Sequence, residues 1–180
     1  MKITKWKTLS REVAFKAHVF RYLKVKSESP TTGAIGDFDI VQCHNWVNVV
    51  AITKDQKIVF VRQYRHGTDQ VTIELPGGAV DPGEDTLLAA KRELREETGY
   101  TSTKWSHLGR VDANPAFMSN HCDTFLALDA EKNEQQELDA FEEIEVQLSD
   151  KESLDDMIKN GEITHSLIVA ALYFFKVAEA

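Results

Sequence analysis

The sequence predicts a mixed α/β fold, an α+β arrangement within one domain, and three observations support that prediction. The chain has 180 residues, close to the roughly 150 of a typical domain. Its first part is rich in β-branched and aromatic residues interrupted by turn-forming residues, a pattern typical of strands. Two later segments, residues 84–98 and 164–178, have helical composition. Hydrophobic residues make up 42% of the chain and charged residues 28%, which is the composition of an ordinary globular protein.

The N-terminal region is expected to form antiparallel strands. Strand-like composition covers residues 13–26 and 38–41, and the turn-forming residues 27–36 separate the two. We therefore expect residues 1–40 to form a sub-unit of their own, joined to a main domain of residues 41–180.

The main domain is expected to begin with a β-hairpin. Residues 46–53 and 57–64 have strand composition and flank a polar tip. Glycine and proline then interrupt the chain at residues 76–78 and again at 81–83. These breaks predict loops between the hairpin and the first helix.

Helices and strands are expected to follow one another over the remaining chain. The helix over 84–98 has leucines and alanines at helical spacing, and Gly99 ends it. Ser149 and Glu152 form a capping-box pattern that predicts a second helix to about residue 159, and the last helix covers 164–178. Strands are expected between the helices at residues 105–111, 124–128 and 144–148.

Charge and composition exclude several classes of function. Lys and Arg number 21, Asp and Glu number 29, and the net charge of −8 gives no attraction to nucleic acid or to an anionic membrane. The longest apolar run, residues 167–175, is shorter than the roughly 20 residues that a membrane-spanning helix needs. Cys43 and Cys122 form no disulfide framework, which suits a reducing compartment. No export signal is visible, so we expect a soluble cytoplasmic protein.

Three carboxylates in the first predicted helix indicate a site for hard divalent cations such as Mg²⁺. At about 100° per residue, Glu93 and Glu97 lie about 40° apart on one face, and Glu96 lies about 60° to the other side of Glu93. Like charges at this spacing repel, and hard cations bind such oxygen clusters together with phosphate oxygens. The turn at Gly77 and Gly78 lets a backbone carbonyl approach the same cation. The alternative is a solvated acidic surface, which charge-rich helices usually present.

The spacing of this whole segment resembles the Nudix box of the Nudix hydrolases. The matching residues are Gly78, Glu84, Arg92, Glu93, Leu94, Glu96, Glu97 and Gly99. Agreement at so many fixed offsets favours the cation site over the solvated surface. The box normally ends in an aliphatic residue, where this chain has Tyr100, and that change leaves the carboxylates intact. By the resemblance, Glu84 and Arg92 brace the helix against the preceding loop.

Segments outside the box resemble the ADP-ribose pyrophosphatase branch, which acts on nucleoside diphosphate sugars. Residues 61–65 and 73–78 match that branch, and Pro115 stands at the family's offset beyond the box, so the similarity covers about residues 37–178. It implies a Nudix fold, in which a mixed β-sheet is sandwiched between helices. It also implies a homodimer in which N-terminal strands cross between protomers. The implied reaction is Mg²⁺- or Mn²⁺-dependent hydrolysis of the diphosphate bond, giving nucleoside monophosphate and sugar phosphate.

The resemblance also assigns roles to individual residues of the metal site. Glu93 and Glu97 would bind Mg²⁺ or Mn²⁺, Glu96 would add a ligand or bridge two metals, and the Gly77 carbonyl would complete the site. The metals would polarise the diphosphate and generate the attacking hydroxide.

Five further residues are implied to bind the substrate. Arg65 and Glu74 match positions that contact substrate, and the Arg65 guanidinium could pair with phosphate; the alternative is a surface arginine at a strand end. Trp46 could stack on a purine base, or it could pack in a core or a dimer interface. Phe117 and Met118 would belong to a loop that lines the pocket.

The chain departs from the family where a general base is expected. Enzymes of this branch take a glutamate from an acidic loop ahead of the strand that begins near Ile144, and that position falls on Ala140. Either Glu142 or a neighbouring carboxylate supplies the base in a shifted register, or the chain is a base-deficient variant. Alanine in an otherwise acidic loop would suit an engineered substrate-trapping variant, and we favour this second reading on the sequence.

Two classes of function follow from the sequence. The first is an enzyme that hydrolyses a nucleoside diphosphate sugar. The second is a non-catalytic sensor that has a Nudix fold and binds a nucleotide sugar. The intact group of carboxylates favours the enzyme, because a sensor does not need charges that repel one another.

Overall fold

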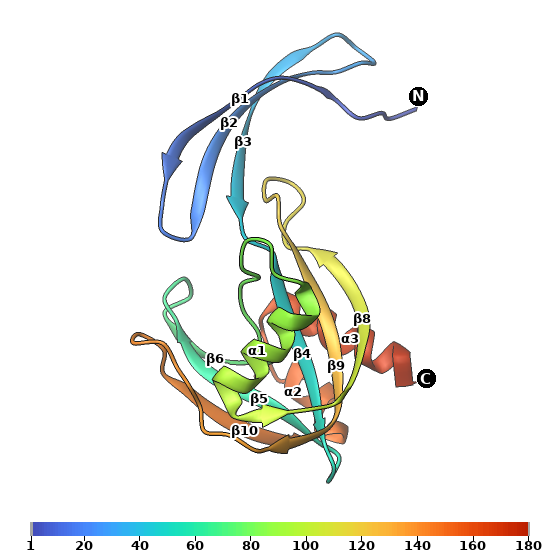
Figure 1. Ribbon diagram of the computed structural model, residues 1–180. Helices are drawn as coiled ribbons and strands as arrows, with labels where there is room; N and C mark the ends of the chain where they lie inside the picture. Colours follow the sequence, from blue (N-terminus) through green and yellow to red (C-terminus); the bar gives the residue numbers. More distant parts are fainter. Residues whose placement is uncertain (1, 180) are drawn as a thin grey trace. The chain divides into compact units, whose positions relative to one another are not determined.

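In a computed structural model that describes residues 2–179, the chain forms two compact units (Figure 1). One unit comprises the chain up to His44 together with Asp112–His121, and the other comprises Asn45–Val111 and the chain from Cys122 onward. The N-terminal unit thus includes a segment that is distant from it in sequence.

The N-terminal unit contains a three-stranded antiparallel sheet. Its strands, in the order β1-β2-β3, are β1 (Lys7–Lys16), β2 (Phe20–Glu28) and β3 (Ile35–Cys43). The strand-like segment 13–26 is divided between β1 and β2. The chain turns between them, where the Ala17 N–H donates to the Phe20 carbonyl (2.9 Å). Every residue of β1 is exposed, including Val13 and Phe15.

The main unit is built on a seven-stranded mixed sheet. Its strands are β4 (Trp46–Thr53), β5 (Lys57–Arg65), β6 (Gln70–Glu74), β7 (Tyr100–Thr101), β8 (Lys104–Asp112), β9 (His121–Lys132) and β10 (Ile144–Asp150). The order is β10-β5-β4-β9-β7, with β6 beside β5 and β8 beside β9. β4 pairs with β5 as the predicted antiparallel hairpin, whereas β4 and β9 are parallel. β6 and β7 were not expected from the sequence, since both are short.

Two helices of the main unit are longer than three turns. α1 spans Thr86–Thr98 and α3 spans Ser166–Glu179. α1 begins at Thr86 rather than at residue 84, because Asp85 is its N-cap and accepts hydrogen bonds from the backbone of the first turn. It ends at Gly99, whose φ of 74° lies in the left-handed region.

The capping box expected at Ser149 is wrong. β10 continues to Asp150, a short 3₁₀ helix (η1, Lys151–Ser153) follows, and α2 covers only Leu154–Lys159. Pairing of Ser149 with Ile58 of β5 keeps that residue in the sheet. No helix within residues 2–179 is long and apolar enough to cross a membrane.

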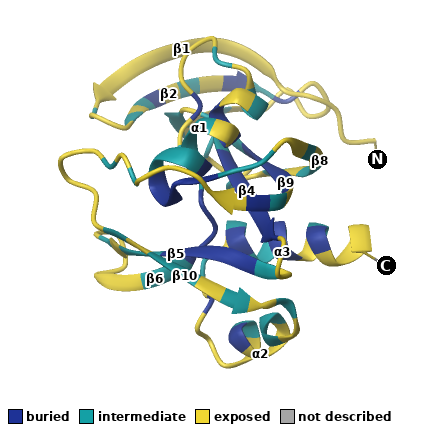
Figure 2. Ribbon diagram, turned by 60° about the horizontal axis from the view of Figure 1, so that its bottom comes forward, coloured by how far each residue is buried: buried dark blue, intermediate teal, exposed yellow. Residues whose placement is uncertain are grey.

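Helices cover both faces of the main sheet, as the resemblance implied. Side chains alternate along a strand, so Val47, Val49 and Ala51 of β4 pack with α1, whereas Val50 and Ile52 pack with α2 and α3. Both faces are therefore core, and Figure 2 shows β4 and much of β9 as buried. This sheet, packed on both faces, positions the loop before α1 and the side chains at the ends of its strands.

Candidate active site

The two glycines before α1 allow the backbone to lie against the carboxylates of that helix. A Cβ on Gly78 would stand 2.6 Å from a carboxylate oxygen of Glu93, and a Cβ on Gly77 would stand 2.1 Å from the Val47 carbonyl oxygen. The Gly77 N–H donates to Glu97 Oε2 at 2.8 Å. Gly77 is thus required for the loop to approach the backbone of β4, and Gly78 leaves the Glu93 carboxylate its position against the loop.

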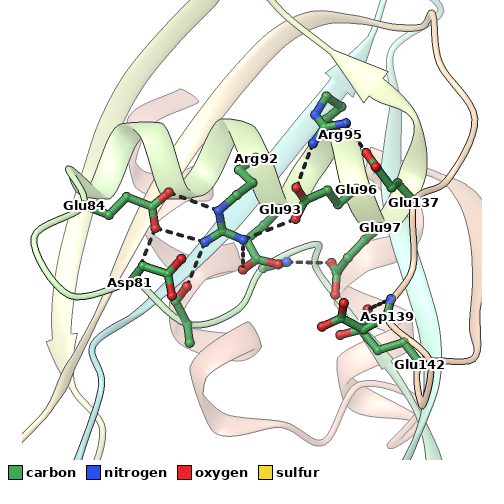
Figure 3. A network of polar contacts seen from close by, with 12 residues as sticks. Asp81, Glu84, Arg92, Glu93, Arg95, Glu96, Glu97, Glu137, Asp139 and Glu142 are labelled. Carbon is green, nitrogen blue, oxygen red and sulfur yellow. Dashed lines mark hydrogen bonds and ion pairs between the residues drawn. The ribbon is translucent and has the colours of Figure 1, made fainter.

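Arg92 joins the loop to the helix (Figure 3). Its guanidinium donates to both carboxylate oxygens of Glu84 at 3.0 Å and to the Ala79 carbonyl at 3.0 Å. It also donates to Glu93 Oε1 at 2.8 Å and to Glu96 Oε2 at 3.3 Å. The bonds from Arg92 hold the pKa of the Glu84 carboxyl below its ordinary value. The bracing role that the resemblance implied for Glu84 and Arg92 agrees with these contacts.

Glu97 is a buried carboxylate with too little positive charge around it. It is 5% exposed, and burial raises the pKa of its carboxyl to about 8, with the negative charges of Glu93 and Glu142 adding to the shift. The Gly77 N–H and the positive charge of Arg65 oppose the shift without cancelling it. Burial also raises the pKa of Glu93, against the bonds from Arg92. A bound cation would relieve this arrangement.

Glu96 faces a different environment from its two neighbours. Its carboxylate accepts from Arg92 and, at 2.7 Å, from Arg95 Nη2, so an arginine is bound to each oxygen. Glu96 does not line the cavity that contains Glu93 and Glu97. Glu96 and Glu93 share Arg92 Nη1 and therefore lie close together, but only Glu93 and Glu97 line the cavity.

A cavity of about 760 Å³ opens beside Glu93 and Glu97. The predicted site residues that line it are Trp46, Arg65, Glu74, Gly77, Glu93, Glu97 and Glu142. Phe117 and Met118 belong to the other compact unit, where both pair with the backbone of Val41 in β3. The structure assigns these two residues no place at the cavity.

Arg65 and Glu74 form a bidentate ion pair on the wall of the cavity. Arg65 Nε and Nη2 each donate to one oxygen of Glu74 at 2.7 Å, and Thr72 Oγ1 donates to Glu74 Oε1 at 2.6 Å. Burial alone would raise the pKa of the Glu74 carboxyl, but these bonds hold it below its ordinary value. The Arg65 side chain is 43% exposed and lines the cavity, so Arg65 can still contact a ligand there.

The acidic loop before β10 presents Glu142, and not Ala140, to the cavity. Residues 139–142 form a turn in which the Glu142 N–H donates to the Asp139 carbonyl (3.0 Å) and the Asp139 N–H donates to Glu142 Oε2 (3.1 Å). Asp139 and Glu142 line the cavity and lie beside Glu97, whereas Ala140 does not line it (Figure 3). The register that assigned the base position to Ala140 therefore has no geometric support.

Several residues that line the cavity were not singled out from the sequence. They are Asn48, Gln63, His66, Thr72, Thr164 and His165. A polar residue within the apolar strand 46–53 was a usable signal for Asn48, whose amide donates to the Leu167 carbonyl at 3.4 Å. No motif in the sequence marks His165. Its Nδ1 accepts from the Leu167 N–H (3.2 Å) at the start of α3, which leaves Nε2 for a ligand.

The donor set suits an open site for a divalent metal ion. Within residues 2–179, no three His, Cys, Asp or Glu side chains are arranged as a complete metal site. Mg²⁺ does not require one, since it commonly binds through one or two carboxylates and takes water and phosphate oxygens as its other ligands. Glu93 and Glu97, with the Gly77 carbonyl in the adjoining turn, are the residues that fit this role.

Comparisons with known proteins agree with this geometry. Residues 43–171 match the model of the NUDIX domain. The chain is 30% identical to an ADP-ribose pyrophosphatase of Bacillus subtilis, covering 100% of this chain and 97% of the relative. It is 32% identical to a methanol dehydrogenase activator of Bacillus methanolicus, covering 99% and 97%. Its fold matches a crystal structure of an ADP compounds hydrolase with a TM-score of 0.85 at 22% identity, covering 98% and 95%. On this sequence and structural evidence, the chain belongs to the Nudix hydrolase family.

Proposed function

We propose that this Nudix hydrolase cleaves the diphosphate bond of a nucleoside diphosphate sugar of the ADP-ribose type, with Mg²⁺ or Mn²⁺ as its cofactor. The products would be a nucleoside monophosphate and a sugar phosphate. The observation that carries the proposal is the position of two carboxylates at a cavity large enough for such a substrate: Glu97, which is buried and short of positive charge, and the partly buried Glu93 beside it. The relative named ADP-ribose pyrophosphatase supports the choice of substrate class.

The residues divide the work between metal binding and proton transfer. Glu93, Glu97 and the Gly77 carbonyl would hold the metal, which when bound supplies charge stabilisation to the diphosphate and lowers the pKa of water. Glu142 would take the proton from the attacking water as general base, since it lines the same cavity beside Glu97. Glu96 would act through Arg92 and Arg95 rather than as a ligand.

Substrate orientation is assigned to the residues on the walls of the cavity. Arg65, held by Glu74, would contact a phosphate with the part of its guanidinium that faces the cavity. Trp46 lies at the start of β4 and would stack on the base. Phe117 and Met118 stay candidates for the substrate loop of the other unit.

A homodimer is part of the proposal. β1 is exposed along its whole length and includes the apolar Leu9, Val13 and Phe15, which are 41%, 52% and 59% exposed. A second protomer that packed on this strand would bury them. Light scattering should give about twice the 20.3 kDa of one chain at micromolar concentration, and a monomer mass would remove the dimer from the proposal.

Metal-dependent formation of nucleoside monophosphate tests the activity directly. Purified protein, stripped of metal and then supplied with Mg²⁺ or Mn²⁺, would be offered ADP-ribose, GDP-mannose, UDP-glucose and diadenosine polyphosphates. We expect turnover that requires the metal and is fastest for a nucleoside diphosphate sugar. Full activity in excess chelator, or no turnover of any sugar nucleotide, would contradict the proposal.

The identity of the base is tested by two substitutions. Glu142→Gln should lower kcat by about 10²–10⁴, the usual cost of losing a general base, and Ala140→Glu should change little. The base-deficient alternative requires the reverse: slow turnover in the unaltered chain, a rise of about 10² or more with Ala140→Glu, and no effect of Glu142→Gln.

A second candidate is a non-catalytic or regulatory role. It is favoured by the 32% identity, over almost the whole chain, to a protein named as an activator of a methanol dehydrogenase. Calorimetry that finds sugar-nucleotide binding without metal-dependent turnover would support this role. Assays with an alcohol dehydrogenase would then measure whether the protein raises its rate.

A further inference from the structure

The loop that contains Glu142 is fastened to the carboxyl end of α1. It runs over residues 133–143, from the end of β9 to the start of β10. The last carbonyls of an α-helix have no partner within the helix and need one elsewhere. The Glu137 N–H donates to the Glu96 carbonyl at 2.8 Å, so the loop provides one such partner.

Gln136 makes the central contact of this attachment. Its Nε2 donates to the Glu97 carbonyl at 2.7 Å and to the Ile144 carbonyl at 3.1 Å. Both hydrogens of the amide are thus used, and both partners are backbone oxygens that can only accept. One side chain therefore joins α1, the loop and the first residue of β10.

We propose that Gln136 is a positioning residue: it joins the two ends of the loop 137–143 and so holds Glu142 beside Glu97. The inference rests on the proposed function, in which Glu142 is the general base. Only Glu143 separates Glu142 from Ile144, so fixing the Ile144 carbonyl limits how far the Glu142 carboxylate can move. Small displacements of a catalytic group are costly, and about 1 Å can lower a rate about 10²-fold.

The loop has further attachments, but they lie at or before Glu137. The N–H groups of Asn133 and Glu134 donate to the Gly99 carbonyl at 3.1 Å. Arg95 pairs with Glu137 at 2.7 Å and with Glu134 at 3.5 Å, but these side chains are 72% and 48% exposed, and exposed ion pairs contribute little. Among these contacts the Gln136 amide alone reaches the Ile144 carbonyl, so it is the contact expected to hold the end of the loop next to Glu142.

Gln136→Met is the direct test, with Gln135→Met as its matched control. Methionine has similar length and donates no hydrogen bond, and Gln135 is the exposed neighbour whose side chain has no partner among residues 2–179. We expect Gln136→Met to lower kcat about 10- to 100-fold with KM changed less than about 3-fold. The control should stay within about 2-fold of the unaltered chain. Unchanged kcat in Gln136→Met would overturn the inference.

The same substitution in a Glu142→Gln background separates positioning from general stability. If Gln136 acts through Glu142, the second change should have almost no further effect, because the group it positions is already lost. An equal further loss would show a general structural role and overturn the inference. A harmless Glu142→Gln would instead remove the proposed base, and the inference with it. A damaging Glu142→Gln beside a harmless Gln136→Met would remove the inference alone.

Hydrogen exchange gives a readout that does not depend on activity. Backbone amides of residues 137–143 should exchange faster in Gln136→Met than in Gln135→Met, while amides of β4 and β5 stay protected. Gln136→Lys keeps a hydrogen-bond donor that can reach the same carbonyls. It should therefore retain more activity, and more protection of the loop amides from exchange, than Gln136→Met. Equal exchange in the loop of all three variants would contradict the proposed role of Gln136.

Discussion

Glu97 and Glu74 are buried to nearly the same degree in one cavity, at 5% and 3% exposure, yet their pKa values shift in opposite directions. The pKa of Glu97 rises to about 8, whereas the pKa of Glu74 falls below its ordinary value. Burial favours the neutral form of both carboxyls. The difference therefore comes from their partners.

Glu74 has a complete set of partners from its own chain. The Arg65 fork and Thr72 compensate the carboxylate. Glu97 has one backbone N–H and further carboxylates as neighbours. Glu74 thus stabilises the wall of the cavity, while Glu97 is left short of a cation that must come from solution.

Removing the charge of Glu97 should have the largest effect. Glu97→Gln should lower turnover at least about 10²-fold, because a metal loses a charged ligand. Steady-state kinetics at saturating Mg²⁺ would measure it. Glu96→Gln, the same change on the same helix, should cost much less because Glu96 is bound by two arginines. An equal loss in both variants would restore Glu96 as a ligand.

Removing the charge of Glu74 should affect stability instead. Glu74→Gln leaves the Arg65 guanidinium without its buried partner and should lower the free energy of unfolding by about 2 kcal/mol. Glu145→Gln is the matched control, since the Glu145 pair with Arg62 is exposed and long (3.3 Å) and should be worth less than about 0.5 kcal/mol. Denaturant titration of both variants would measure the difference. Equal, small losses would show that the buried pair contributes no more to the free energy of unfolding than the exposed pair.

The two glutamates should also give stability opposite dependences on pH. The folded chain keeps a proton on Glu97 between about pH 4.5 and 8 that the unfolded chain has lost, so this residue makes stability fall as pH rises through that window. Glu74 adds stability above the pKa of its unfolded form, and that contribution is lost as pH falls through its lowered folded value. In metal-free buffer, Glu97→Gln should reduce the first slope, and the raised pKa of Glu93 should leave a smaller slope of the same sign. An unchanged slope in Glu97→Gln would assign it to another group.

The sequence predicts correctly those features that depend on residues close together in the chain. Helix 84–98, its end at Gly99 and the hairpin at 46–64 follow from short-range patterns, and the structure confirms them with a two-residue change at the Asp85 cap. The spacing of Glu93 and Glu97 likewise places both on one face whatever the rest of the fold does.

Competing and long-range contacts explain what the sequence could not predict. Glu96 bonds to Arg92 and Arg95 of its own helix, and helical geometry alone does not decide whether these contacts or metal binding prevail. The position of Glu142 depends on a turn at residues 139–142. Counting positions back from Ile144 cannot predict which side chain such a turn directs into the cavity. His165 reaches the cavity from the start of α3, far from the box in sequence.

Metal binding by matched variants tests the difference between the two glutamates most directly. Mn²⁺ binding would be followed by calorimetry or by electron paramagnetic resonance for the unaltered chain, Glu97→Gln and Glu74→Gln, all without substrate. The unaltered chain and Glu74→Gln should bind with affinities within about 3-fold of each other, and Glu97→Gln should bind at least about 10-fold more weakly, because of these two glutamates only Glu97 is a proposed ligand of the ion. Equal affinity of Glu97→Gln and the unaltered chain would contradict the assignment of Glu97 as the carboxylate that awaits a cation.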